Sequence, residues 1–240
     1  MCLLKKHNSS HATLHHPIQK QRYLRLCSPF FYTFPLSVQA IGEYAFCGCK
    51  GIGDIIIPDN VVTLGKYAFS ECSGFTGNLI IGNNVEIINE RTFNECTGLS
   101  GTLKFGNSIT SIEKYAFYGC SSLTGNIDLP ETVIYIKDYA FQGCLGFEGY
   151  LKLGPNIKSI GFVAFATITK LYNQYHQKLN FKNIYCMAIT PPKIDICSFG
   201  MSDYRYHFWP EHLLVPVGCK TLYENKQGWD FFTTIEETEF

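Results

Sequence analysis

The chain has 240 residues, of which 46% are hydrophobic and 17% charged, and its formal net charge at neutral pH is zero. This composition supports a folded chain with a continuous apolar core, and it does not indicate a nucleic-acid-binding surface. No run of about 18 apolar residues occurs, so the sequence predicts no transmembrane segment.

The first 31 residues are basic and polar, unlike the rest of the chain. Residues 1–42 contain five lysines and arginines and no acid. A signal peptide needs an apolar run of about seven or more residues, and we recognise none in the sequence as given. We expect residues 1–31 to be disordered. Two explanations stay open: an intracellular protein, or a start site placed upstream of a truncated repeat array.

Four histidines in this segment are candidate metal ligands. His7, His11 and His15 follow a helical spacing beside His16, and they could hold a transition metal if the segment were helical. Pro17 and the polar residues around them favour disorder instead. We therefore predict no metal site.

From Tyr32 onward the sequence repeats with a nearly fixed period. The copies align on a phenylalanine, and the steps between successive copies are 23, 24, 24, 24 and 24 residues. A period in this range is typical of a solenoid, in which each coil packs against its neighbours. The predicted ladder of stacked rings is Phe46, Phe69, Phe93, Phe117, Phe141 and Phe165.

Every copy predicts the same path through one coil. An alternating pair such as Leu103 and Phe105 indicates a short strand that ends in a turn. A second extended piece follows, as in residues 109–112. About one helical turn is expected over residues such as 113–117, which is too short to be stable without stacking.

The residue three positions before the phenylalanine alternates in charge from coil to coil over the first five coils. Opposite charges on adjacent coils attract each other and like charges repel. We therefore interpret this column as a selector of register between coils, and not as a binding site. Its members are Glu43, Lys66, Glu90, Lys114 and Asp138.

Cysteines fill another slot of the repeat. The chain has 11 of them, at repeat spacing and not in CxxC pairs, which argues against a disulfide framework or a zinc site. We predict a buried column of thiols, with Cys47 as the most exposed thiol. Because neighbouring strands lie about 4.8 Å apart, oxidation between neighbours stays an alternative. The column is Cys49, Cys72, Cys96, Cys120 and Cys144.

The repeat resembles that of the BspA-like leucine-rich repeat proteins of bacteria and protists. The stretch LTGNIDLPETVIYIKDYAFQGC, from Leu123 to Cys144, follows the family pattern almost throughout. The chain departs from it at Arg91-Thr92, where the family has Tyr-Ala, and in the irregular stretch 167–181, where Ile168 replaces the cysteine.

The resemblance implies an α/β repeat, mainly β with short helical turns, folded as a right-handed leucine-rich-repeat solenoid with an irregular C-terminal cap. Residues 183–192 and 213–237 are similar to the closing segment of bacterial members. We expect three parts: a basic, disordered segment over 1–31, the solenoid over 32–170, and irregular last coils with the cap over 171–240.

The same resemblance implies a surface or secreted interaction protein, of the kind linked with adhesion to a host or matrix protein, with a glycan as a further option. It implies no reaction and no cofactor, and no catalytic pattern surrounds His176, His207 or His212. A structural spacer or an intracellular scaffold without a ligand on the strand face is the alternative. The sequence makes no prediction about oligomeric state.

The expected ligand surface is the exposed face of the strands. In each strand the residue between the two buried ones points to solvent. We expect Tyr150, Lys152 and Lys104 to contribute most, because aromatic and long cationic side chains combine apolar contact with polar pairing. Exposed isoleucines can also reflect β-propensity alone, so this alternative stays open. The candidates are Ile56, Ile80, Lys104, Asp128, Tyr150 and Lys152.

Overall fold

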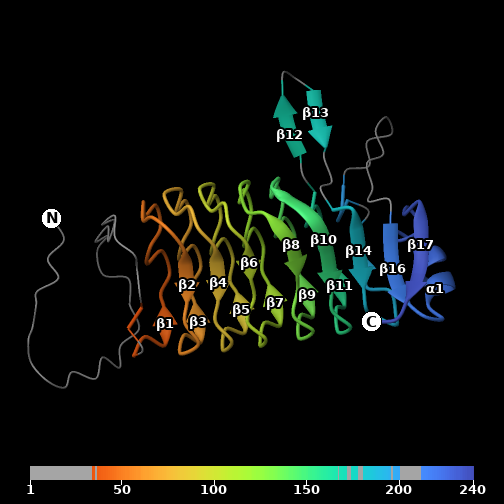
Figure 1. Ribbon diagram of the computed structural model, residues 1–240, viewed down its shortest axis with the longest axis horizontal. Helices are drawn as coiled ribbons and strands as arrows, with labels where there is room; N and C mark the ends of the chain where they lie inside the picture. Colours follow the sequence, from red (N-terminus) through yellow and green to blue (C-terminus); the bar gives the residue numbers. More distant parts are fainter. Residues whose placement is uncertain are drawn as a thin grey trace, which may run out of the picture.

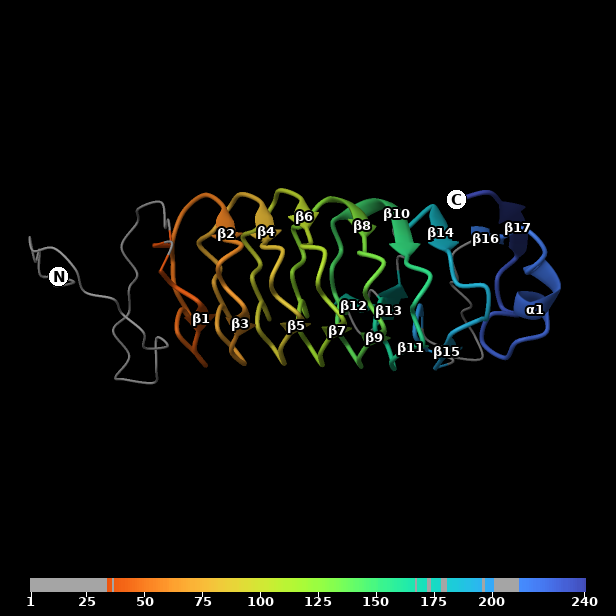
Figure 2. The same ribbon diagram turned by 90° about the horizontal axis from the view of Figure 1, so that it is seen from below.

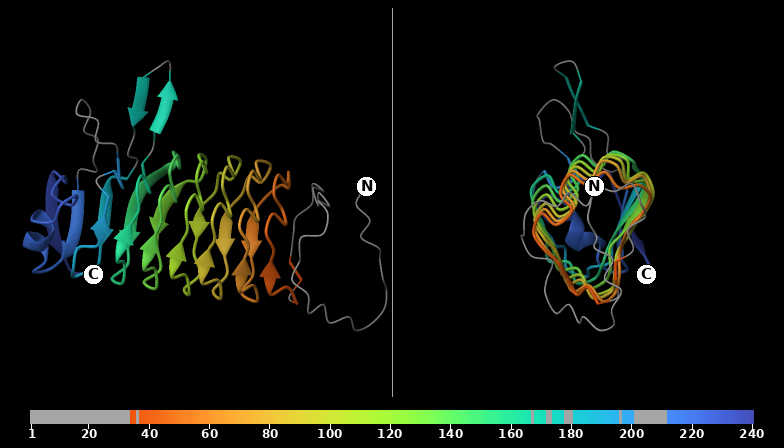
Figure 3. Two further views of the ribbon diagram at one scale, coloured as in Figure 1. Left: turned by 180° about the vertical axis from the view of Figure 1, so that it is seen from behind. Right: turned by 90° about the vertical axis from the view of Figure 1, so that its left-hand side faces the viewer.

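The computed structural model describes residues 34–35, 37–166, 168–171, 174–177, 181–195, 197–200 and 212–240. Segment 1–31 with its four histidines lies outside the described residues, and so do Tyr32 and His207. The described chain winds into a rod of stacked coils (Figure 1), and the view along the rod shows the coils superimposed on one another (Figure 3). This is the predicted solenoid, mainly β.

One strand of each coil lies on the same side of the rod, and neighbouring strands are parallel (Figure 2). Equivalent residues stack in register: Leu79 pairs with Leu103, and Leu151 pairs with Ile184. These strands form a three-stranded sheet of β2 (Ile55–Ile57), β4 (Leu79–Ile81) and β6 (Leu103–Lys104). They also form a five-stranded sheet of β8 (Gly125–Asp128), β10 (Phe147–Leu153), β14 (Asn183–Cys186), β16 (His212–Pro216) and β17 (Thr234–Thr238).

The second extended piece of each coil forms short parallel strands on another side of the rod. Each has two residues, because the chain turns again as soon as its apolar residue has entered the core. The first pair is β1 (Ala40–Ile41) with β3 (Thr63–Leu64). A five-stranded sheet follows, with β5 (Ile87–Ile88), β7 (Ser111–Ile112), β9 (Tyr135–Ile136), β11 (Ser159–Ile160) and β15 (Lys193–Ile194).

Phenylalanine rings stack along the core as predicted. Ring centroids of successive rungs from Phe46 to Phe165 lie 4.9–5.4 Å apart, with planes inclined by 5–14°. The ladder continues to Phe199, whose ring stacks on Phe165 at 5.7 Å. The 34-residue step between these two rungs was not predicted. It accommodates an antiparallel hairpin, β12 (Ile168–Leu171) and β13 (Gln174–Gln177), that protrudes from the rod (Figure 1).

The closing segment is fixed to the seventh coil by buried polar contacts. It contains α1 (Lys220–Glu224), the one helix among the described residues. The Tyr223 hydroxyl donates to the Ala188 carbonyl at 2.6 Å, and the Trp229 indole N–H donates to the Pro192 carbonyl at 2.8 Å. Both rings are fully buried, so the last coil is closed by aromatic packing and satisfied hydrogen bonds.

The predicted helical turn is wrong. The chain there forms a run of turns, in which alternate N–H groups donate within the coil and to the next coil. Ala68 N–H donates to Gly65, whereas Phe69 N–H donates to Thr92 of the next coil at 2.8 Å. A helix would direct every donor along its own axis, so contacts between coils replace it. The exchange requires positive φ, between 55° and 60°, at Tyr44, Tyr67, Arg91, Tyr115, Tyr139 and Val163.

The cysteine column is buried and reduced, as predicted. From the second coil on, each thiol donates to the carbonyl of the phenylalanine in the preceding coil, as Cys120 does to Phe93 at 3.0 Å. Cysteine suits this slot because it is small and apolar and still offers a weak donor to a buried carbonyl. None of the nine cysteines among the described residues is in a disulfide, and Cys47 and Cys197 are the two that are not buried.

Candidate binding face

The predicted ligand residues lie on one face of the rod. We call the row of Ile56, Ile80, Lys104, Asp128 and Lys152 the strand column, and the face that carries this row and its neighbouring row the strand face. Pairing aligns Ile56 with Ile80 and Ile80 with Lys104 in the first sheet, and Asp128 with Lys152 in the second. The Ile56 side chain is 46% exposed, and Lys104 and Asp128 are exposed as well. The structure therefore brings five of the six sequence candidates together in one row, and the sixth, Tyr150, lies in the next row on the same face.

The strand column extends further than the sequence candidates. Lys152 pairs with Tyr185, Tyr185 with Leu214, and Leu214 with Glu236. The signal for Tyr185 was the alternation in NIYC, where Ile184 and Cys186 are buried and Tyr185 is not. The closing segment thus adds its own strands to the same face.

An aromatic cluster lies on this face over the sixth and seventh coils. The rings of Tyr150 and Tyr185 contact edge to face at 5.5 Å, and Tyr185 contacts Phe240 at 6.3 Å. Phe240 is 51% exposed, and both tyrosines are half-buried. Close to the cluster, the Lys152 ammonium lies 3.9 Å from the Asp128 carboxylate. Such a mixture of aromatic rings and charge is typical of residues that dominate binding energies.

The neighbouring column on the same face is used internally. Asn78 N–H donates to the Asp54 carboxylate at 2.6 Å, and Thr102 N–H donates to the Asn78 amide oxygen at 2.9 Å. Tyr150 N–H donates in the same way to Asn126 at 3.0 Å. These short polar side chains satisfy backbone donors of the next coil, which explains their residue types without a ligand.

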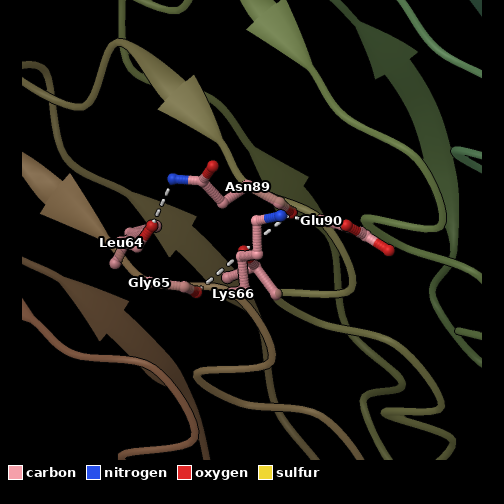
Figure 4. A network of polar contacts seen from close by, with 6 residues as sticks. Leu64, Gly65, Lys66, Asn89 and Glu90 are labelled. Atoms are coloured by element: carbon pink, nitrogen blue, oxygen red, sulfur yellow. Dashed lines mark hydrogen bonds and ion pairs between the residues drawn. The ribbon is translucent and has the colours of Figure 1, made fainter.

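Residues of the alternating charge column form ion pairs between adjacent coils, as predicted. Lys66 Nζ lies 3.2 Å from Glu90 (Figure 4), and Lys114 Nζ lies 2.8 Å from Asp138. The hydrogen bond from Lys114 lowers the pKa of Asp138, and the same pair raises the pKa of Lys114. Beside the Lys66–Glu90 pair, the Asn89 amide donates to the Leu64 carbonyl at 2.7 Å (Figure 4). These side chains hold adjacent coils to each other.

A ladder of tyrosines on the turn edge was not predicted. Tyr115 stacks on Tyr139 at 4.8 Å, and Tyr44 stacks on Tyr67 at 4.7 Å. The Arg91 guanidinium fills the gap, 5.5 Å from the Tyr67 ring and 4.7 Å from the Tyr115 ring. Cation–π contact therefore explains why arginine replaces tyrosine in this coil. The stacked tyrosine rings therefore cover one another's faces, and Arg91 covers the faces of Tyr67 and Tyr115.

Two of the C-terminal histidines lie in described strands, His176 in β13 and His212 in β16. His212 Nδ1 lies 4.0 Å from Glu236 on the strand column, with both side chains largely exposed. Of His176 only the backbone is described, in β13.

The part of the chain that the structure describes contains no group of three or more His, Cys, Asp or Glu side chains that could hold a metal ion. No helix among the described residues has the length and hydrophobicity to cross a membrane.

Comparison with known proteins identifies the repeat. A family model described as BspA type leucine rich repeat region matches residues 18–124 and 101–190, in six copies. The crystal structure of a leucine-rich repeat protein from Bacteroides ovatus is similar, with 21% identity and a TM-score of 0.56. That match covers 85% of this chain and 48% of the other. At this identity the likeness concerns the fold.

A second solved structure is the pneumococcal vaccine antigen PcpA, with 17% identity and a TM-score of 0.44, over 85% of this chain and 60% of the other. The chain thus spans less than two thirds of the length of both solved proteins. Comparison with curated proteins gives no match.

Proposed function

The chain belongs to the BspA-type leucine-rich repeat proteins, and we propose that it is a non-catalytic module that binds another protein through the strand column. The leucine-rich repeat is typically a scaffold for binding, and its partner is set by exposed residues while the core stays constant. The proposal concerns the described solenoid, whatever further parts a longer protein would carry.

One observation carries the proposal. The strand column is a row of exposed, chemically unlike side chains that continues across the coils, from Ile56 through Lys104 to the cluster of Tyr150 and Tyr185. The neighbouring polar column, the charge column and the tyrosine ladder each have contacts between coils that account for their residues. On the strand face, the ion pair of Lys152 with Asp128 and the ring contact of Tyr150 with Tyr185 also join adjacent coils. The exposed side chains of Ile56 and Lys104 support a role outside the fold.

We further propose that the chain acts at a cell surface or after secretion, as an adhesion-type protein whose ligand is a host or matrix protein. Family membership supports this location. Its test is fractionation of producing cells with and without protease treatment of the intact surface. Loss of the chain from treated cells is expected, whereas full protection from the protease would indicate an intracellular scaffold.

The binding test compares two sets of variants against a panel of purified extracellular matrix proteins. For any binder, Tyr150→Ala, Lys152→Ala and Lys104→Ala are measured beside Glu43→Ala and Lys66→Ala on the charge column. Truncation of a dominant interface residue costs about 2 kcal/mol or more, or about 30-fold in affinity. We expect such a loss for Tyr150→Ala. If the charge-column variants weaken binding and the strand-column variants do not, the proposed face is wrong.

A further inference from the structure

The sheet beneath the strand column is interrupted between the fourth and fifth coils. β6 and β8 belong to separate sheets, and the pairing described between them is one isolated bridge, Thr102 with Thr124. One coil further on, Leu129 N–H donates to the Lys152 carbonyl at 3.1 Å. Among the described residues, the equivalent bond from Phe105 N–H to the Asp128 carbonyl is missing. Backbone groups on both sides of this break are therefore available for pairing.

Phe105 accounts for the break. It occupies the strand slot that holds isoleucine or leucine at Ile57, Ile81, Leu129 and Leu153, and that holds Phe34 in the first coil. Its larger ring lies across two rungs of the core, with edge contacts to Phe117 at 5.8 Å and to Phe141 at 6.5 Å. On the opposite side of the rod β7 and β9 remain paired. The break in strand pairing is therefore confined to the side of the rod that carries β6 and β8.

A groove of about 610 Å³ lies at this break. This volume falls in the range of roughly 300–1,000 Å³ that is usual for ligand sites. Phe105, Leu129 and Pro130 give it an apolar floor, and Lys104 and Glu131 lie along its rim. Lys104 and Glu131 are exposed, and neither forms an ion pair among the described residues. The groove thus combines an apolar floor, available backbone groups and one free charge of each sign.

We propose that this groove is the specificity pocket of the strand column, and that it takes an extended polypeptide segment of the partner protein. The segment places an apolar side chain on Phe105 and Leu129, an acidic side chain against Lys104 and a basic side chain against Glu131. Its backbone lies in the groove over the break, where its polar groups can bond the Phe105 N–H and the Asp128 carbonyl. The inference rests on the proposed function, because it names the ligand of that same face.

A polypeptide fits these observations better than a sugar. An extended chain carries N–H and C=O groups along its length, so it can bond the backbone groups that are left unpaired between β6 and β8. It can also carry charges of opposite sign on neighbouring residues, which matches Lys104 and Glu131. A neutral glycan offers neither feature.

The test uses random 12-residue peptides displayed on phage and selected on the full chain. Enriched peptides are measured on two groove variants, Lys104→Glu and Asn107→Trp, which reverse one rim charge and fill the groove from an exposed lining residue. The matched controls are Lys158→Glu and Thr63→Trp, at exposed positions outside the groove. Thermal unfolding checks that all four variants fold.

We expect enriched peptides to carry an acidic, an apolar and a basic residue in succession. Their affinity falls at least tenfold on both groove variants and stays within twofold on both controls. Replacing the acidic residue of the peptide by lysine restores binding to Lys104→Glu, because the pair is then reversed on both sides.

Several results would overturn the inference. One is that no peptide distinguishes the wild type from Asn107→Trp. Another is a glycan, found on a glycan array, whose binding Asn107→Trp abolishes. If a matrix protein loses affinity for Tyr150→Ala but binds Asn107→Trp normally, the groove proposal fails while the proposed function stands.

Discussion

Replacing Phe117 by alanine tests the stacked core at its centre. The side chain is fully buried and lies between two rungs, 5.4 Å from Phe93 and 4.9 Å from Phe141, with Phe105 at its edge at 5.8 Å. Removal of a buried phenylalanine costs about 3–5 kcal/mol, because the transfer energy is lost and a cavity is left. The upper part of that range applies here, since the neighbouring rings are held by their own coils and cannot close the gap.

The assay is thermal unfolding followed by circular dichroism. For a chain of 150–250 residues, 1 kcal/mol corresponds to roughly 2–4 °C in Tm, so a loss of about 4–5 kcal/mol in Phe117→Ala should lower Tm by roughly 8–20 °C. Lys114→Ala is the control in the same coil, because its exposed ammonium contributes one surface ion pair with Asp138. Phe117→Leu should recover part of the loss. Equal Tm values for Phe117→Ala and Lys114→Ala would refute the ladder as the source of stability.

Three further predictions concern titratable groups. Among the cysteines that the structure describes, a thiol reagent should label Cys47 and Cys197 first and the column only after denaturation, because the column is buried away from the reagent and burial raises the pKa of Cys96 and Cys144. Mass spectrometry counts the labels at each site, and disulfides along the column would contradict the assignment. Burial and the nearby Glu71 raise the pKa of Glu95 above its ordinary value of 4.5, so the native state is favoured while Glu95 is protonated and loses that contribution as pH rises through the raised pKa. Glu95→Gln should therefore raise Tm relative to the wild type at pH 7 but not at pH 4. A Tm difference between variant and wild type that is the same at both pH values would contradict this prediction. The hydrogen bond from Lys114 lowers the pKa of Asp138 below 3.8, so Asp138→Asn should lower Tm at neutral pH, with a difference that vanishes as pH falls through the lowered pKa; a constant difference would exclude this ion pair as its cause.

Strict periodicity made the core predictable. A buried slot tolerates few residue types, so the phenylalanine and cysteine columns stand out in the sequence, and coils of equal length must stack them. The strand column follows from the same rule, because side chains alternate between core and solvent along a strand. The ladder beyond Phe165 was missed because the inserted hairpin lengthens the step to Phe199 to 34 residues.

Features that depend on contacts between coils could not be predicted from one copy of the repeat. The sequence of residues 113–117 is compatible with a helical turn, but hydrogen bonds to the next coil select turns with positive φ. Phe105 fits the apolar pattern of its slot, so only its contacts with two rungs of the core account for the break between β6 and β8. In the same way, Arg91 looked like a departure from the repeat until its place between two tyrosine rings was visible.

Hydroxyl-radical footprinting tests the choice of face most directly, because it reports on all exposed aromatic side chains in one experiment. The chain is oxidised alone and in complex with a bound matrix protein, and modified residues are located by mass spectrometry. The account predicts protection of the cluster of Tyr150, Tyr185 and Phe240 on the strand face, with Tyr44 and Tyr139 on the turn edge oxidised equally in both states. Protection of Tyr44 and Tyr139, with the strand column oxidised as before, would contradict it.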